Sequence, residues 1–367
     1  MAFRLPAGVW HENGGAFKMI KRRSFLAAFS LPFILYPSTP FARRPRVPVG
    51  AIRWDAWYTP GSPQTAAVSR SLGERRFKDR IPTFGSQCEG DRICFPEDIQ
   101  SEIKTEIDMA ADAGLDFWAF VAYERGHPLR RAFEHYLSSK NSSRVKFSLI
   151  CDAGRFHNKE LRLDHAKLIG DPRYQNCRSG KPIYCIMINE LQRDFTSLAR
   201  DILEFRRLVA EKTGKNLTVL AMYSSRRNSD PAGMEAFDGS AYYSIVCSKA
   251  GNGYSALAEC AEQTWERKAQ FDALYAPTIM TGWDRSPREM HPVFWEAPRS
   301  YPGINFGRPT RLEFANHIKS GLVFAQNNSD TPAVFIYAWN EFDEGGWLYP
   351  TKGDKFDRLA TLRSLLL

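Results

Sequence analysis

The chain has 367 residues, enough for one large domain or two smaller ones. Its hydrophobic content of 43% and aromatic content of 13% predict a folded protein with a substantial core. The formal charge is +9, but residues 1–42 hold five basic residues and one acid, so the rest of the chain carries only +5. No basic run interleaved with aromatic residues remains, and we therefore expect no nucleic acid partner.

Residues 1–42 predict an upstream extension followed by an export signal. Arg22, Arg23, Phe25 and Leu26 form a pattern that resembles a twin-arginine signal, and a short apolar run follows at 27–36. That run is shorter than the roughly 20 residues that span a bilayer. We expect cleavage near Ala42 and a periplasmic or secreted domain at 43–367 without stable membrane insertion. An uncleaved signal anchor is the alternative, and translation that begins at Met19 would leave residues 1–18 out.

Short β-rich runs alternate with helical patterns after residue 48. The predicted strands are 49–58, 115–123, 145–151, 182–189, 217–223, 238–246, 274–281 and 332–339. The predicted helices are 97–113, 128–139, 160–169, 196–213, 254–272, 311–327 and 354–366, with a weak helical pattern at 230–237. This order predicts one (β/α)8 TIM barrel, and the lack of a Gly-x-Gly-x-x-Gly turn after the first strand argues against an open doubly wound sheet. We expect the long connections 59–96 and 282–310 to shape a substrate groove.

The seven cysteines suggest a mixed arrangement. Cys88 and Cys94 flank a short polar loop and can close a disulfide in an oxidising compartment. Cys151 and Cys185 lie in apolar runs and are interpreted as small core residues. No Cys/His cluster has zinc-ligand spacing, so we expect neither a metal nor a cofactor.

Carboxylates and aromatic residues recur where the predicted strands end. The carboxyl ends of barrel strands lie on one face, where such enzymes place their active sites. The residues that we expect to bind substrate there are Asp55, Trp57, Tyr58, Tyr123, Asp152, Tyr223, Tyr242, Trp283, Asp284, Arg288, Trp339, Asn340 and Trp347.

Glu341 and Glu344 are the candidate catalytic pair. They follow the apolar run that ends the last predicted strand, and their i, i+3 spacing on a turn can bring both side chains to one side. Two carboxyl groups beside flat aromatic faces suit glycoside hydrolysis, in which one group gives a proton and the other takes one. The sequence alone leaves open whether the reaction retains or inverts the anomeric configuration.

The segment Trp339-Asn340-Glu341-Phe342-Asp343-Glu344-Gly345 resembles the Trp-Asn-Glu-x-x-Glu-Gly signature of glycoside hydrolase family 99 and the related WbsX-like proteins. The segment from Gly282 to Arg288 resembles the Gly-Trp-Asp-x-x-Pro-Arg element of the WbsX-like group. The resemblance implies a (β/α)8 barrel and retaining cleavage of α-mannosides. It also implies that Glu341 is the base toward the sugar's own 2-hydroxyl and that Glu344 is the acid/base. Phe342-Asp343 departs from the aromatic/His-type pair common between the two glutamates.

Rival interpretations stay open. Asn189-Glu190 at the end of the fourth predicted strand resembles the acid/base of many other barrel glycosidases, so Glu190 is the alternative catalytic residue, although strand seven offers Asp284 where those enzymes carry a Glu nucleophile. The expected function is an exported glycosidase that acts on a polysaccharide or glycoconjugate as a monomer. The alternatives are a transglycosylase or glycosyltransferase-like protein of polysaccharide assembly and a non-catalytic glycan-binding barrel.

Overall fold

The computed structural model describes residues 46–189, 194–224, 234–247, 253–296 and 303–367. These residues belong to one compact unit that extends from Pro45 to Leu367. The export signal predicted in residues 1–42 and the alternative catalytic residue Glu190 lie outside the described residues.

A parallel sheet of eight strands forms the centre of the domain, in the order β8-β7-β6-β5-β4-β1-β10-β9. Its strands are β1 (Val49–Arg53), β4 (Phe117–Val121), β5 (Lys146–Asp152), β6 (Ile183–Ile188), β7 (Thr218–Tyr223), β8 (Gly239–Tyr242), β9 (Thr278–Met280) and β10 (Val334–Tyr337). A parallel bridge between Ala241 and Ala276 joins the two edge strands and closes the sheet. The predicted (β/α)8 barrel is therefore confirmed.

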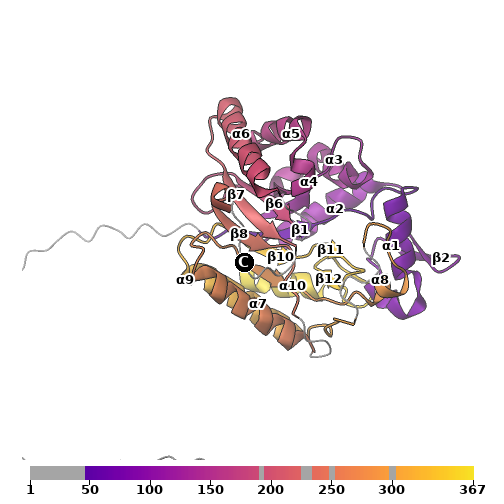
Figure 1. Cartoon of the computed structure of the whole chain (residues 1–367). Coiled ribbons are helices and arrows are strands. Elements are labelled where there is room, and N and C mark those ends of the chain that lie inside the picture. The colour runs from indigo at the N-terminus through magenta and orange to yellow at the C-terminus, as the bar shows by residue number, and fades with distance from the viewer. Residues whose placement is uncertain (1–45, 190–193, 225–233, 248–252, 297–302) are drawn as a thin grey trace, which may run out of the picture. The chain divides into compact units, whose positions relative to one another are not determined.

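Helices cover the outside of the barrel (Figure 1). On one side lie α2 (Ile99–Asp112), α3 (Arg131–Ser138), α4 (Ala153–Phe156), α5 (Lys159–Ile169) and α6 (Phe195–Thr213). On the opposite side lie α7 (Gly253–Ala269), α9 (Arg311–Asn327) and α10 (Asp357–Leu366). The helix ends follow local rules: Asp98 caps α2 by accepting from the Ser101 amide, and Gly214 ends α6 at a φ of +68°.

The two long connections contain structure that the sequence patterns did not predict. The first holds α1 (Pro63–Gly73), the 3-10 helix η1 (Arg75–Arg80) and the hairpin of β2 (Ser86–Cys88) and β3 (Arg92–Cys94). The second holds α8 (Ser286–Met290), which packs against α1. The predicted 230–237 helix is described only from 234 onward, where a 3-10 turn, η4 (Met234–Ala236), precedes β8.

Strand residues alternate between two apolar layers, as the pleat requires. One set, including Ile52, Phe117 and Ala241, packs inside the barrel against other strand residues. The other set, including Ala51 and Trp118, packs outward with helix residues such as Ile103. This alternation decides which strand-end side chains can reach the barrel mouth.

The cysteines pair more extensively than the sequence indicated. The predicted Cys88–Cys94 disulfide is present and closes the β2–β3 hairpin. A second disulfide, Cys247–Cys260, joins the segment after β8 to α7. The remaining cysteines, Cys151, Cys177 and Cys185, are free thiols and buried. Cys151 and Cys185 are therefore core residues, as predicted.

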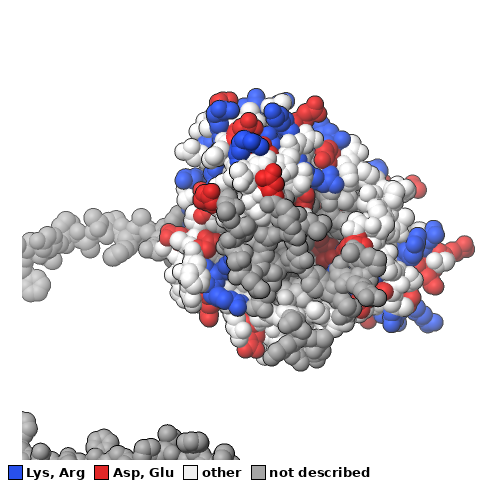
Figure 2. All heavy atoms as spheres, viewed as in Figure 1, with Lys and Arg blue, Asp and Glu red and all other residues white. Residues whose placement is uncertain are grey.

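Basic and acidic side chains are interspersed on the described surface in the view of Figure 2, over α5 and α6 and around the β2–β3 hairpin. This face carries no broad patch of one sign outside the grey residues. Within the described ranges, no helix combines the length and the apolar character that crossing a membrane requires.

Candidate active site

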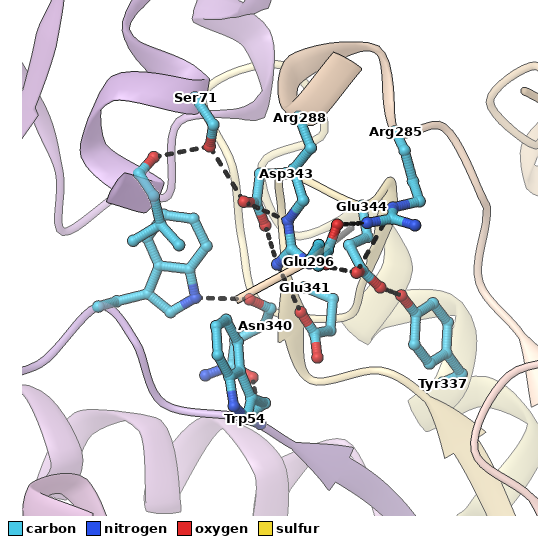
Figure 3. Close-up of polar contacts among 12 residues, drawn as sticks. Trp54, Ser71, Arg285, Arg288, Glu296, Tyr337, Asn340, Glu341, Asp343 and Glu344 are labelled. Carbon is cyan, nitrogen blue, oxygen red and sulfur yellow. Dashed lines mark hydrogen bonds and ion pairs between the residues drawn. The ribbon is translucent and has the colours of Figure 1, made fainter. Parts of the chain in front are cut away.

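The segment that contains the two candidate glutamates leaves β10 at the mouth of the barrel and folds back as a two-stranded hairpin of β11 (Asn340–Glu341) and β12 (Gly346–Trp347). The turn of this hairpin contains Phe342, Asp343 and Glu344. Its compactness brings the acidic side chains of residues 341, 343 and 344 around one arginine, Arg288, which α8 supplies (Figure 3).

Glu341 lies in an environment that disfavours its charge. Its side chain is only 3% exposed. Tyr243 donates a hydrogen bond to Oε1 over 2.6 Å, whereas Oε2 has no hydrogen-bond partner among the described residues. The nearest cation is Nη2 of Arg288, 3.7 Å from Oε2. Burial and the nearby charge of Glu344 raise the pKa of Glu341 well above its ordinary value, and Arg288 opposes this only in part.

Glu344 lies in the opposite environment, although it is three residues away. Arg288 donates to Oε1 and Tyr337 donates to Oε2, so both carboxylate oxygens accept a hydrogen bond. Nε of a second arginine, Arg285, lies 3.6 Å from Oε1. Burial works against ionisation, but the charges of Arg288 and Arg285 outweigh it and lower the pKa of Glu344. The pair therefore combines a carboxyl group whose pKa is raised with one whose pKa is lowered.

Arg288 is the centre of the polar cluster. Its Nε and Nη2 donate to the two oxygens of Asp343 over 2.8 Å and 3.0 Å, and Nη1 donates to Glu344 and Glu296. Arg285 also pairs with Glu296. The two arginines thus form ion pairs with four carboxyl groups, at residues 296, 341, 343 and 344.

Half-buried aromatic side chains surround the pair. Tyr243 contacts Glu341 directly, and Trp54 donates from its indole nitrogen to the Tyr123 hydroxyl over 2.8 Å. The rings of Trp54 and Trp295 lie 5.4 Å apart, and the Arg288 guanidinium lies 5.5 Å from the Trp54 ring centre. Flat, amphipathic faces of this kind suit the apolar faces of sugar rings.

Several residues predicted to bind substrate are instead buried behind the motif. Asn340 accepts from the Trp54 amide and donates to Asp55 over 3.0 Å, and burial raises the pKa of Asp55 to about 6 against the charge of Arg53. Trp57 donates to the Asn340 carbonyl. Tyr58 and Trp339 are buried as well, and each donates to a carboxylate oxygen of Glu106 on α2. These contacts join β1, α2 and the motif.

The other residues predicted to bind substrate do not form a single group. Tyr223 and Tyr242 are buried and pack against each other in the outer layer. Trp347 is buried and donates to Asp354. Asp284 pairs with Arg80 and accepts from Ser286 at the start of α8, so it has a structural role in this loop. Trp283 is buried beside Tyr337, at a ring distance of 5.7 Å.

Asp152 is half-buried and accepts from the Gly154 amide and, over 3.4 Å, from Asn189. Arg288 belongs to the site, but its contacts are with the protein's own carboxylates rather than with open space.

The residues predicted above to bind substrate do not include Trp54, Tyr243, Tyr337, Trp295 and Arg285, although Tyr243 follows Tyr242 at the end of a predicted strand. For Tyr243 a signal existed, because the alternation that points Ala241 into the barrel also points Tyr243 inward and Tyr242 outward. The same alternation from Ile52 predicts an inward Trp54. Trp295 and Arg285 lie in an irregular connection that has no such periodicity.

Metal binding has no geometric support in the described part of the chain. Within those ranges, no three His, Cys, Asp or Glu side chains are grouped in a way that could hold a metal ion. The acidic side chains of the site are neutralised by arginines instead.

Comparison of the sequence with protein-family models and with curated proteins finds no match. The fold nevertheless defines a class, the (β/α)8 barrels similar to that of glycoside hydrolase family 99. A GH99 endo-alpha-mannosidase from Bacteroides thetaiotaomicron aligns with a TM-score of 0.54 and 12% identity over 87% of this chain and 97% of its own. Its complex with BIS-TRIS-propane aligns with a TM-score of 0.53 and 13% identity over 86% of this chain and 95% of its own. At such identities the similarity is one of fold.

Proposed function

We propose that this protein is a glycosidase that cleaves glycosidic bonds of a polysaccharide or glycoconjugate with Glu341 and Glu344 as the catalytic pair. The observation that carries the proposal is the contrast within the pair. Both glutamates contact one guanidinium, yet the pKa of Glu341 is raised and that of Glu344 is lowered. An acid and a base held side by side are what hydrolysis of a glycosidic bond needs.

The fold similarity to GH99 endo-alpha-mannosidases and the Trp-Asn-Glu-x-x-Glu-Gly segment support a retaining reaction, with α-mannosides as the first substrates to test. In that mechanism Glu341 is the base toward the 2-hydroxyl and Glu344 is the acid/base. The pKa shifts favour a proton on Glu341 and a charge on Glu344, whereas this mechanism needs the reverse. Binding of such a substrate would therefore have to move the proton from Glu341 to Glu344. The pair holds one proton before and after this transfer.

The test is incubation of the full chain with a panel of α- and β-linked glycans, including α-mannosides, with products followed by proton NMR. We expect turnover of one linkage class and a first product that keeps the anomeric configuration of the substrate. Binding without cleavage would replace the proposal with a glycan-binding barrel. Transfer of the sugar to another glycan rather than to water would replace it with a transglycosylase.

A further inference from the structure

Asp343 has no part in the proposed chemistry, yet it is the best-bonded carboxylate of the site. It is fully buried and accepts from Nε and Nη2 of Arg288 over 2.8 Å and 3.0 Å, and Ser71 on α1 donates to Oδ2 over 3.0 Å. A bidentate pair of this kind fixes the plane of the guanidinium as well as its position. Asp343 also lies where the segment departs from the family 99 pattern, between the two glutamates.

The fixed guanidinium plane determines where the other N–H groups of Arg288 point. A guanidinium has five N–H donors. Two bind Asp343, and the two on Nη1 bind Glu344 and Glu296. The fifth lies on Nη2, which is 3.7 Å from Oε2 of Glu341, the oxygen without a hydrogen-bond partner among the described residues. One side chain therefore reaches both glutamates.

We propose that Asp343 is a positioning residue that fixes Arg288 so that one guanidinium keeps Glu344 charged and stabilises Glu341 whenever Glu341 is ionised. The inference rests on the proposed function of the glutamate pair. The proton that Glu341 gives up passes to Glu344, which then protonates the departing sugar oxygen, and Arg288 itself stays protonated throughout. Asp343 touches no substrate and acts through Arg288.

The groups that face Glu341 decide whether a substitution of Asp343 raises or lowers the pKa of Glu341. Glu344 and Asp343 raise the pKa of Glu341, whereas Arg288 and the Tyr243 hydrogen bond lower it. Tyr123 faces Glu341 from the end of β4, while Arg285 and Glu296 pair with each other and with Glu344 or Arg288 at the far side of the cluster. Asp343→Asn removes a charge that raises the pKa of Glu341, but it also frees Arg288, which lowers that pKa, so the two effects oppose each other. Asp343→Glu keeps the charge and displaces Arg288, so in this variant the pKa of Glu341 should rise.

The kinetic test is a double-mutant cycle of Asp343→Asn and Arg288→Lys on the glycan that the parent cleaves. We expect Asp343→Asn to lower kcat about tenfold or more while KM stays within about threefold, because the site loses geometry rather than substrate contacts. In Asp343→Glu, which keeps the charge, the alkaline limb of kcat/KM should move to higher pH. The double variant should be no slower than Arg288→Lys, since Asp343 acts through that residue. A double variant that multiplies the two single losses, or the parent pH profile in Asp343→Glu, would overturn the proposal.

Asp201→Asn is the matched control. It also removes a carboxylate from a buried arginine, Arg162, at the contact of α5 and α6 away from the motif, and we expect parent kinetics. Asp343→Glu keeps the charge but displaces Arg288 by one methylene, so we expect slower turnover and an alkaline limb at higher pH. This variant decides the question if Asp343→Asn does not fold.

An infrared titration separates this inference from the proposed function. The part of the protonated-carboxyl band that Glu341→Gln removes belongs to Glu341, and in Asp343→Glu this part should persist to higher pH than in the parent. This readout needs no turnover. A parent that cleaves no glycan would contradict the proposed function alone, whereas an unchanged titration in Asp343→Glu would contradict the positioning role alone.

Discussion

Glu341 and Glu344 are the same residue type three positions apart, yet their neighbours give them opposite acid–base properties. Among the residues that the structure describes, Tyr243 is the one hydrogen-bond donor to Glu341, whereas Arg288 and Tyr337 both donate to Glu344 and Arg285 lies nearby. These neighbours come from β8, β10 and the α8 connection, so the difference arises from the tertiary fold and not from the motif itself.

The pair predicts a bell-shaped dependence of kcat/KM on pH. Activity needs one proton in the pair, so it should fall on the acid side when Glu344, whose pKa is lowered, takes up a second proton. It should fall on the alkaline side when Glu341, whose pKa is raised, loses the proton. Glu341→Gln should abolish the alkaline limb in the residual activity. A parent profile that stays flat well above neutral pH would contradict this electrostatic account.

At the residue scale, the sequence predicted Glu341 and Glu344 as the candidate catalytic pair. The residues that it predicted to bind substrate include some that lie near the pair and others that are buried in the core. Alternation along β8 and into the next residue directs Tyr243 to the barrel mouth and Tyr242 to the outer layer. Counting the inward-facing positions of this strand would therefore have selected Tyr243 over Tyr242 from the sequence. The burial of Asn340 and Trp339 could not be predicted in this way. Their roles depend on Asp55 and Glu106, which are more than 200 positions away along the chain.

At the scale of elements, two glycines hold the catalytic hairpin against the loop after β9. A Cβ on Gly282 would lie 2.3 Å from the Gly345 carbonyl oxygen, and one on Gly345 would lie 2.3 Å from the Asp284 amide nitrogen. Gly345 also has a φ of +88°. Asp284 donates from that amide to the Glu344 carbonyl over 2.7 Å. The close backbone approach therefore fixes Glu344 relative to α8 and its arginines.

Gly345→Ala should destabilise the protein by about 3 kcal/mol, because it adds a backbone clash to the strain of positive φ. Gly180→Ala is the matched control, with a φ of +86° and open space around the added methyl; it should cost only about 1 kcal/mol. Urea unfolding of both variants measures the difference. If both variants lose the same free energy of unfolding, the close backbone approach at Gly345 adds no steric cost to the substitution.

The main helices and strands were predictable because their apolar periodicity is strong, and α9 occupies the predicted range 311–327. The first strand was predicted too long, since residues 54–58 continue the apolar pattern after β1 ends at Arg53. The helices α1 and α8 were missed because both are short, begin at or next to a proline and lie in connections rich in loop-forming residues. α8 matters most, because it carries Arg288.

At the scale of the whole molecule, two disulfides agree with folding in an oxidising compartment, which is what the predicted export signal in residues 1–42 would provide. The export signal itself remains a proposal. Of the seven cysteines in the chain, three are free and buried. Burial raises the pKa of Cys151 to about 12, which further suppresses the reactive thiolate.

Thiol counting tests this arrangement. In the native protein we expect no reactive thiol, after denaturation three, and after denaturation with reduction all seven. Ellman titration of protein purified from the periplasm or medium of an exporting host measures each number. Four or more thiols after denaturation alone would contradict the two disulfide bonds.

The most direct test of the catalytic account is the turnover of Glu341→Gln and Glu344→Gln on the glycan that the parent cleaves, with Asp201→Asn alongside. Loss of an acid or base group should lower kcat by about 100-fold or more in both variants, while binding of the glycan and thermal unfolding stay close to the parent. Asp201→Asn should turn over at the parent rate. Full turnover by either glutamine variant that binds and folds normally would contradict the claim that this pair performs the chemistry.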